Sequence, residues 1–274
     1  MTGRPLDTVC TVLGIGRATA YRGTPGRPAF YTKPDDATIH AQIRAVLHTR
    51  GSYGYRRVTV VLNRTFGTHY NRKRIQRVMQ LTGLVVPRRR RRVGGRPHRG
   101  RIIRPASNER WCGDAFEIAC WDGVVLRVAF VLDCHDRECL ALVVVPRALT
   151  SVDIQQLLRD AVHTRFGTTR APVACQWLTD NGVIFTALPT VLVAEQLGLV
   201  PITTPIASPE SNGMAEAFVQ TLRRDYLDGA DLVSPTVMRA FPGWIADYNT
   251  EAPHSGLQML SPVAWRRAQL EGTP

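Results

Sequence analysis

Long hydrophobic runs are missing from this 274-residue chain: no stretch of 18 or more apolar residues occurs, so we expect no transmembrane helix. The first 25 residues hold four charged side chains and no extended apolar segment, which argues against a secretory signal peptide. The six cysteines show no Cys-x-x-Cys spacing and are interpreted as free thiols of a reducing cytoplasm. A zinc site made of His40, His48, His69 and a cysteine is a weak alternative, because these spacings fit no usual zinc finger.

Acidic residues are in short supply. The chain has 22 Asp+Glu against 35 Lys+Arg, which gives a formal net charge of +13 and an isoelectric point near 10.2. Most of the basic residues are arginines, whose planar guanidinium suits phosphate recognition. This balance predicts attraction to a polyanion, and we interpret the chain as a nucleic-acid-binding protein. A basic protein without such a partner is the alternative.

The N-terminal third of the sequence is predicted to be helical. Residues 1–34 are expected to form a short helical segment, with a second short helix at 17–22, followed by a proline-rich linker. Residues 35–86 are predicted to form a DNA-binding domain of three helices. Asp35 or Asp36 can cap the first helix and Asn71 the third.

The third of these helices is predicted to have one apolar and one basic side. Its apolar side holds Ile75, Val78, Met79 and Leu81. A helix of this kind is what a helix-turn-helix domain inserts into a DNA groove, and the solvated face of a small bundle is the alternative. The predicted DNA-contacting residues on the basic side are Arg72, Lys73, Arg74 and Arg77.

Residues 87–107 are predicted to be an arginine-rich linker between two domains. Like charges at this density do not pack together, so we expect an extended segment that follows DNA phosphates and carries no sequence preference. Its five consecutive arginines are Arg88, Arg89, Arg90, Arg91 and Arg92.

From residue 108 the pattern changes to alternating strands and helices. The expected order is β-β-β-α-β-α-β-α over residues 108–228, which predicts an α/β fold: a mixed five-stranded sheet flanked by helices. The expected strands are Trp111–Trp121, Val124–Asp133, Leu140–Val145, Val173–Leu178 and Leu199–Thr203, and the expected helices are 150–166, 188–197 and 213–227. Residues 229–274 are expected to add a helical extension, kinked or interrupted at Pro242.

Three acids lie in or next to predicted strands and helices of this pattern. Asp114 lies in the first strand, Asp180 ends the run Gln176-Trp177-Leu178-Thr179-Asp180, and Glu216 lies at the start of the last helix, with 35 residues between it and Asp180. Three carboxylates that converge from two strands and a helix can hold two hard divalent cations around a phosphodiester. The sequence therefore predicts a site for two Mg²⁺ ions, which Mn²⁺ can replace, in an enzyme that cuts and joins DNA.

Each acid on its own has a more ordinary interpretation. Asp180 with Asn181-Gly182 is typical of a turn, and a lone Glu216 is typical of an exposed helix residue. Asp133 and Asp136 are rival carboxylates, and we expect them in a solvated turn. Only the three acids on this order of elements favour a metal site.

Some other residues have a structural and a DNA-contacting interpretation. Trp111, Trp121 and Trp177 are predicted to pack in the core, with stacking on a base as the alternative. Asn212-Gly213 is expected to need a positive φ or a close approach to DNA. His254 is predicted to be structural or to contact DNA.

This order of elements with these acids resembles the RNase H-like catalytic core of retroviral-type integrases and DDE transposases. The resemblance is closer to the OrfB-type protein of bacterial insertion sequences, and it covers nearly the whole chain. It is carried by Gly51-Ser52-Tyr53-Gly54-Tyr55-Arg56-Arg57, by residues 108–114, by residues 177–182, by residues 208–219, and by Tyr248-Asn249 with Pro253-His254-Ser255-Gly256-Leu257 and Ser261-Pro262.

The resemblance implies roles for particular residues. Asp114 and Asp180 would be the two metal-binding aspartates, and Glu216 the glutamate that completes the site. The basic residue two turns beyond the glutamate, usually a lysine, is Arg223 here, and a role on terminal DNA phosphates is implied.

The resemblance also implies an activity and partners. These are cleavage of the ends of an insertion sequence and transfer of their 3′-hydroxyls into DNA, by a homo-oligomer in the bacterial cytoplasm and nucleoid. A frameshift that fuses the chain to an upstream DNA-binding partner is a further implication. Two alternatives stay open: a structure-specific nuclease of the same fold, and a catalytically silent DNA-binding regulator.

Overall fold

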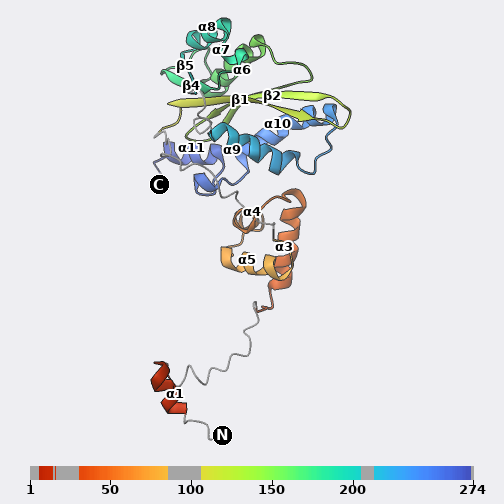
Figure 1. The fold of residues 1–274 in the computed structure, drawn as a ribbon, viewed down its shortest axis with the longest axis vertical. Helices are drawn as coiled ribbons and strands as arrows, with labels where there is room; N and C mark the ends of the chain where they lie inside the picture. The colour runs from red at the N-terminus through yellow and green to blue at the C-terminus, as the bar shows by residue number, and fades with distance from the viewer. Residues whose placement is uncertain (1–5, 15, 17–30, 86–105, 205–212, 273–274) are drawn as a thin grey trace.

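The computed structural model describes residues 6–14, 16, 31–85, 106–204 and 213–272 (Figure 1). A short helix, α1 (Leu6–Leu13), comes first. A unit of three helices and then a larger sheet-containing part follow it. The predicted second helix at 17–22 and the run Arg88–Arg92 lie outside the described residues.

The three-helix unit consists of α3 (Asp36–Thr49), α4 (Tyr55–Phe66) and α5 (Arg72–Leu81). Apolar residues at helical spacing meet in its centre, where Ile39, Leu62 and Ile75 are fully buried. The side chain of Asn71 accepts a hydrogen bond from the Lys73 N–H, so the predicted cap of α5 is confirmed. Asp35 precedes α3 but makes no such side-chain cap.

The sheet is mixed and has five strands, as predicted, and their spatial order is β3-β2-β1-β4-β5. β1 pairs antiparallel with β2, and β2 with β3, whereas β4 pairs parallel with both β1 and β5. The central strand is therefore the one that carries Asp114. The strands are β1 (Arg110–Ala119), β2 (Val125–Asp133), β3 (Cys139–Val145), β4 (Cys175–Thr179) and β5 (Leu199–Thr203).

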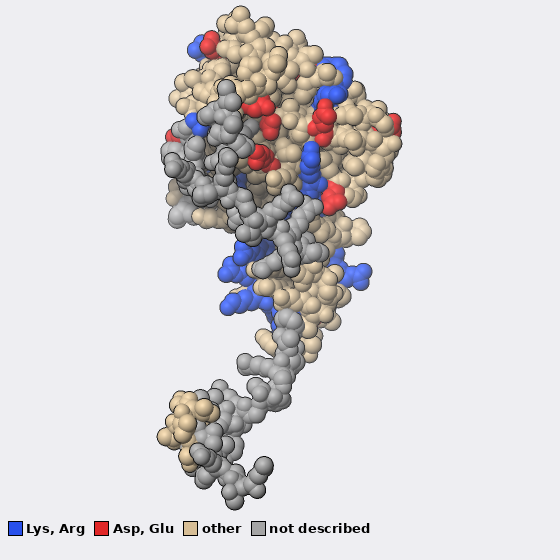
Figure 2. Space-filling model, viewed as in Figure 1, with Lys and Arg blue, Asp and Glu red and all other residues tan. Residues whose placement is uncertain are grey.

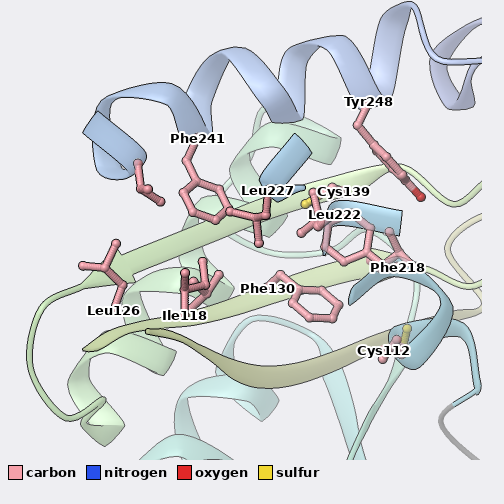
Figure 3. Close-up of a cluster of buried hydrophobic side chains, with 14 of the residues drawn as sticks. Cys112, Ile118, Leu126, Phe130, Cys139, Phe218, Leu222, Leu227, Phe241 and Tyr248 are labelled. Atoms are coloured by element: carbon pink, nitrogen blue, oxygen red, sulfur yellow. The ribbon is translucent and has the colours of Figure 1, made fainter. Parts of the chain in front are cut away.

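Helices cover both faces of the sheet (Figure 1). One face packs against α6 (Ser151–Phe166) and α8 (Leu188–Gln196), with the short α7 (Val183–Thr186), which the sequence pattern did not predict. The other face packs against α9 (Gly213–Leu222) and α10 (Ser234–Thr250). On that side Phe218, Phe241 and Tyr248 point into one apolar cluster (Figure 3).

The C-terminal helices differ from the sequence pattern in two ways. α9 ends at Leu222 and continues as a π-helical turn, η2 (Arg223–Leu227), where one helix was expected. α10 is one helix that runs through Pro242, so the expected alternative of an interruption at this proline is wrong. Phe241 and Tyr248 anchor its two halves in the same core. The last helix is α11 (Pro262–Leu270).

The three-helix unit is joined to the C-terminal helices by ion pairs that all have the same polarity. The arginines belong to the three-helix unit and the acids to η2, α10 and the residue after it. Arg57 pairs with Asp225 at 2.6 Å, Arg64 pairs with Glu251 at 2.8 Å, and Arg50 makes a bidentate pair with Asp247. The Ser52 hydroxyl also donates to Asp225. We call this set of contacts the docking interface.

No helix in the described part of the chain is long and apolar enough to cross a membrane.

Candidate catalytic site

The register of the sheet places Asp114 and Asp180 side by side. β1 and β4 run parallel, with Cys112 opposite Leu178, so two residues further along each strand Asp114 is level with Asp180. Cys112 and Leu178 both pack in the apolar cluster on the α9 face. Side chains alternate between the faces of a strand, so Asp114, two residues after Cys112, lies on the same face as Cys112. Asp180 directly follows the end of β4.

Glu216 reaches this place from α9. The helix packs on β1 through Phe218, whose ring centroid lies 4.5 Å from that of Phe130, the residue opposite Asp114 on β2. Ala215 and Phe218 are buried, which leaves Glu216 on the exposed side of the first helical turn. The sheet and one helix therefore bring the three predicted acids to one region.

The charges of these acids act on one another. The pKa of Asp114 is raised, first by its partial burial and then by the negative charges of Asp180 and Glu216. The Ala115 N–H, which donates to the Asp114 carboxylate at 2.8 Å, opposes this shift only partly. The site thus concentrates negative charge that a cation would offset.

The donor chemistry fits a hard divalent cation, since all three side chains supply carboxylate oxygens. Asp180 Oδ1 accepts the Gly182 N–H at 2.9 Å, and a Cβ at Gly182 would lie 2.9 Å from the same oxygen, so the glycine leaves room for this turn. Within the described segments, no three Asp, Glu, His or Cys side chains are close enough together to hold a metal ion as they stand.

The rival carboxylates Asp133 and Asp136 are buried, so the expectation of a solvated turn is wrong. Arg165 lies between them with its side chain only 1 % exposed, at 3.0 Å from Asp136 and 3.2 Å from Glu138. Burial, followed by the charge of Asp136, raises the pKa of Asp133 to about 6 despite Arg165. These acids form a buried ion cluster, which the sequence did not reveal because Arg165 lies far along the chain.

The basic side of α5 also needs a correction. Arg77 is 8 % exposed and forms a bidentate pair with Asp36, so it does not belong to an exposed DNA-reading face. Arg74 bonds to Asp35 at 3.0 Å and is half-buried. Arg72 and Lys73 are exposed, as predicted. The helical pattern alone could not show which arginines the acids of α3 would engage.

Sequence reasoning missed a basic groove between the three-helix unit and α9, which we call the seam groove. It has a volume of about 460 Å³, and its charged lining comprises four arginines and one acid: Arg56, Arg57, Arg137, Arg224 and Asp225. The motif that contains Arg56 and Arg57 was noted only for its resemblance. Figure 2 shows Lys and Arg gathered on the three-helix unit and acidic side chains on the sheet-containing part.

His254 lines the same groove, and the structure favours its structural interpretation. Its ring stands at 85° to Tyr248 with centroids 4.6 Å apart, and its Nε2 lies 3.3 Å from the Tyr248 carbonyl oxygen. Burial, with a smaller contribution from the nearby cations Arg137 and Arg57, lowers the pKa of His254 to about 4. The ring is therefore neutral at neutral pH.

The tryptophan prediction holds for two of three residues. Trp111 and Trp177 are buried in the core, whereas Trp121 is 69 % exposed, so its predicted place in the core is wrong. Trp121 lies in the tight turn after β1, at one end of the sheet and outside its apolar clusters. Gly213 has no positive φ, so that alternative is wrong, and Asn212 lies outside the described residues.

Comparisons with known proteins agree with this fold. The family described as HTH-like domain matches residues 33–92, and two families described as Integrase core domain match residues 104–209 and 198–262. A chain of the simian T-cell lymphotropic virus intasome in complex with PP2A regulatory subunit B56 gamma has a similar fold. It superposes with a TM-score of 0.51 at 16 % identity, over 83 % of this chain and 74 % of that one. The fold is thus RNase H-like and the class is that of the integrases and transposases.

The sequence relatives are more specific. Transposase InsD of insertion element IS2A/D/F/H/I/K from Escherichia coli is 38 % identical over 88 % of this chain and 82 % of its own length. An insertion element IS136 protein of Agrobacterium fabrum is 48 % identical over 64 % of this chain and 91 % of its own length. The chain belongs to the OrfB-type insertion-element transposases, which are polynucleotidyl transferases. The family acts on DNA and generally uses divalent metal ions.

Proposed function

We propose that this transposase cleaves the ends of its insertion element and joins their 3′-hydroxyls to DNA, with Asp114, Asp180 and Glu216 as the catalytic acids. The observation that carries this proposal is the parallel register of β1 and β4, which sets the two aspartates level with each other beneath α9. The raised pKa of Asp114 supports it, because two further carboxylates act on that side chain.

The chemistry consists of two transfers at phosphorus. In cleavage, water attacks the phosphodiester, a P–O bond forms, and the bond to the 3′-oxygen breaks to leave a 3′-hydroxyl. In joining, that hydroxyl attacks a phosphodiester of the target, whose own 3′-oxygen leaves. Two Mg²⁺ ions would supply Lewis-acid stabilisation of the attacking and leaving oxygens. The three carboxylates would hold the ions, and no covalent protein–DNA intermediate is needed.

The DNA path would follow the basic features. Arg72 and Lys73 are the exposed cations of α5, and Arg223 lies at the other end of α9 from Glu216. The seam groove lies between these places and would hold backbone phosphates. Arg88 to Arg92, which are outside the described residues, would add phosphate contacts without sequence preference.

The remaining expectations belong to the same proposal. The domains would be 1–34, 35–86, 87–107, 108–228 and 229–274, as the sequence pattern indicates. The protein would act as a homo-oligomer on DNA in the bacterial cytoplasm, with or without an upstream-frame partner.

The experiment uses the full-length protein, a labelled duplex that ends in the element's terminal sequence, and a plasmid target. Joined product is expected with Mg²⁺ or Mn²⁺, little product with Ca²⁺, whose coordination is less strict, and none with EDTA. Cleaved DNA without joined product would favour the structure-specific nuclease. Activity that survives EDTA, or activity that is lost in EDTA and restored only by Zn²⁺, would contradict the carboxylate site.

A further inference from the structure

Trp121 is a large aromatic side chain that the fold leaves in solvent. It follows β1 in the turn to β2 and is 69 % exposed, whereas Trp111 and Trp177 are at most 1 % exposed. A single exposed apolar residue is ordinary on a protein surface. The surroundings of Trp121 therefore decide what it does.

The turn that carries Trp121 is fixed from two directions. The Trp121 N–H donates to the Leu232 carbonyl oxygen at 2.8 Å. The carboxylate of Asp122 accepts the Ser234 N–H at 3.0 Å and the Ser234 hydroxyl at 2.6 Å, at the start of α10. An aromatic ring on a backbone held in this way loses little conformational freedom when it stacks on a ligand.

Trp121 also has cationic neighbours. It lines a surface hollow of about 880 Å³ together with Gln220, Arg223, Arg224 and one acid, Asp228. Arg224 is paired with Asp225, which leaves Arg223 as the cation nearest to the strand that carries Trp121. The guanidinium of Arg223 lies 5.8 Å from the Phe116 ring and donates to the Glu117 carbonyl oxygen at 3.4 Å, so it reaches over β1 between Trp121 and Asp114. An aromatic ring beside arginines is the combination with which proteins bind single-stranded nucleic acid.

The hollow lies in line with the catalytic acids. Glu216 and Arg223 are seven residues apart in α9 and η2 (223 − 216), which is about 10 Å along the helix. Asp114 and Trp121 are also seven residues apart (121 − 114), which is at most about 23 Å, because β1 ends at Ala119 and the chain then turns. Carboxylates, guanidinium and indole therefore follow one another along the side of the sheet that α9 covers.

We propose that Trp121 is a nucleobase-binding residue, whose indole stacks on one unpaired base of the DNA strand held at the catalytic acids. Arg223 faces the backbone of the same strand on its way to Trp121. Stacking uses the face that every base has, so the site takes an unpaired base of any sequence. This inference rests on the proposed function, because that function sets the scissile phosphate at Asp114, Asp180 and Glu216.

The test measures affinity for an element-end duplex in which one nucleotide at a time is abasic, in Ca²⁺ so that the DNA stays intact. The scan covers the first seven nucleotides of the cleaved strand, because about 23 Å equals roughly seven rises of 3.4 Å. The proteins are wild type, Trp121→Ala and Trp121→Phe. The matched control is Leu188→Ala, which removes an apolar side chain with the same 69 % exposure from α8, on the other face of the sheet.

We expect wild type and Leu188→Ala to lose about 5- to 150-fold in affinity at one abasic position. Trp121→Ala should bind intact DNA that much more weakly and show no further loss at that position, while Trp121→Phe keeps most of the affinity. An unchanged melting temperature of Trp121→Ala would show that the loss is not one of folding. If Trp121→Ala binds intact DNA like wild type, or is still weakened by the same abasic position, the proposal is overturned.

The joining assay on the same preparations separates this proposal from the function on which it rests. If the wild-type protein joins DNA but Trp121→Ala binds DNA as wild type does, only the proposal of a base-binding site is contradicted. Failure of the wild-type protein to cleave or join DNA would instead remove the proposed function, and the base-binding site with it.

Discussion

Asp114 combines partial burial with two like-charged neighbours, which is the usual way in which a protein raises the pKa of a carboxyl group. At neutral pH its ionised form therefore opposes folding of the metal-free protein, and a bound cation would reverse that effect. Two other residues show that the amino-acid type alone does not fix where a side chain lies. Trp121 was predicted in the core and is exposed, whereas Arg77 was predicted to contact DNA and lies in a buried ion pair.

We predict that Asp114→Asn stabilises the metal-free protein at pH 7, by less than about 1 kcal/mol because the side chain is partly exposed. The pKa of Asp114 is higher in the folded than in the unfolded protein, so the gain in stability of Asp114→Asn is complete above the folded-state pKa. The gain disappears as the pH falls below the unfolded-state pKa, where Asp114 in wild type is protonated and as neutral as the asparagine. Urea unfolding in EDTA from pH 7 to pH 3 measures this. A constant difference over that range would contradict the assignment.

The same change should remove stabilisation by Mg²⁺. A cation that binds only the folded state adds about 2.7 kcal/mol at one hundred times its dissociation constant. Wild type should therefore gain melting temperature with Mg²⁺ and Asp114→Asn should gain much less. Asp122→Asn is the control, since its carboxylate is engaged with Ser234. Equal gains in wild type and Asp114→Asn would place the metal elsewhere.

At the scale of elements, the strands and helices could be predicted because their apolar residues recur at spacings of two or near 3.6. Asp180 was placed correctly since the apolar run ends just before it. What the pattern could not show are pairings between distant residues. Arg165 lies 32 positions after Asp133 (165 − 133), so the sequence did not indicate that the two side chains form an ion pair. The helix α7 has only four residues, which are too few to show a helical periodicity.

We predict that Arg165→Met destabilises the protein by about 3–5 kcal/mol, because it leaves Asp133 and Asp136 buried without their cation. Arg159→Met, on the exposed side of the same helix, should change stability by less than about 0.5 kcal/mol. Urea titrations of both variants at pH 7 provide the comparison. Similar stability of the two variants would mean that the buried cluster contributes nothing.

At the scale of the whole molecule, the docking interface sets the three-helix unit against the helices that follow Glu216. Burial favours the neutral form of Asp225, but hydrogen bonds from Arg224, Arg57 and Ser52 outweigh this and lower its pKa. Because Asp225 lies in the turn that continues α9, the docking interface and Glu216 lie on one continuous helical segment. The sequence could not reveal this arrangement, since Arg57 and Asp225 are 168 residues apart.

We predict that Asp247→Arg separates the three-helix unit from the sheet-containing part, since it sets a cation against Arg50, and that Arg50→Asp in the same chain restores docking. The radius of gyration from small-angle scattering should rise in the single variant and return in the double variant. In wild type it should also rise progressively as the pH falls from about 4 toward the lowered pKa of Asp225. The stabilisation by Asp225 is complete above its unfolded-state pKa and is lost as the pH falls through its folded-state pKa. A radius unchanged by Asp247→Arg would show that the ion pairs do not hold the units together.

The most direct test of the catalytic assignment is strand joining by single-acid variants. Full-length Asp114→Asn, Asp180→Asn and Glu216→Gln are compared with wild type and with Glu195→Gln, an exposed acid of α8, on a duplex that already ends in a 3′-hydroxyl. The account predicts that each of the three variants loses more than about 100-fold in joining rate with Mg²⁺ while DNA binding stays within a few-fold, and that Glu195→Gln joins like wild type. Joining near the wild-type rate by any of the three would remove that residue from the catalytic site.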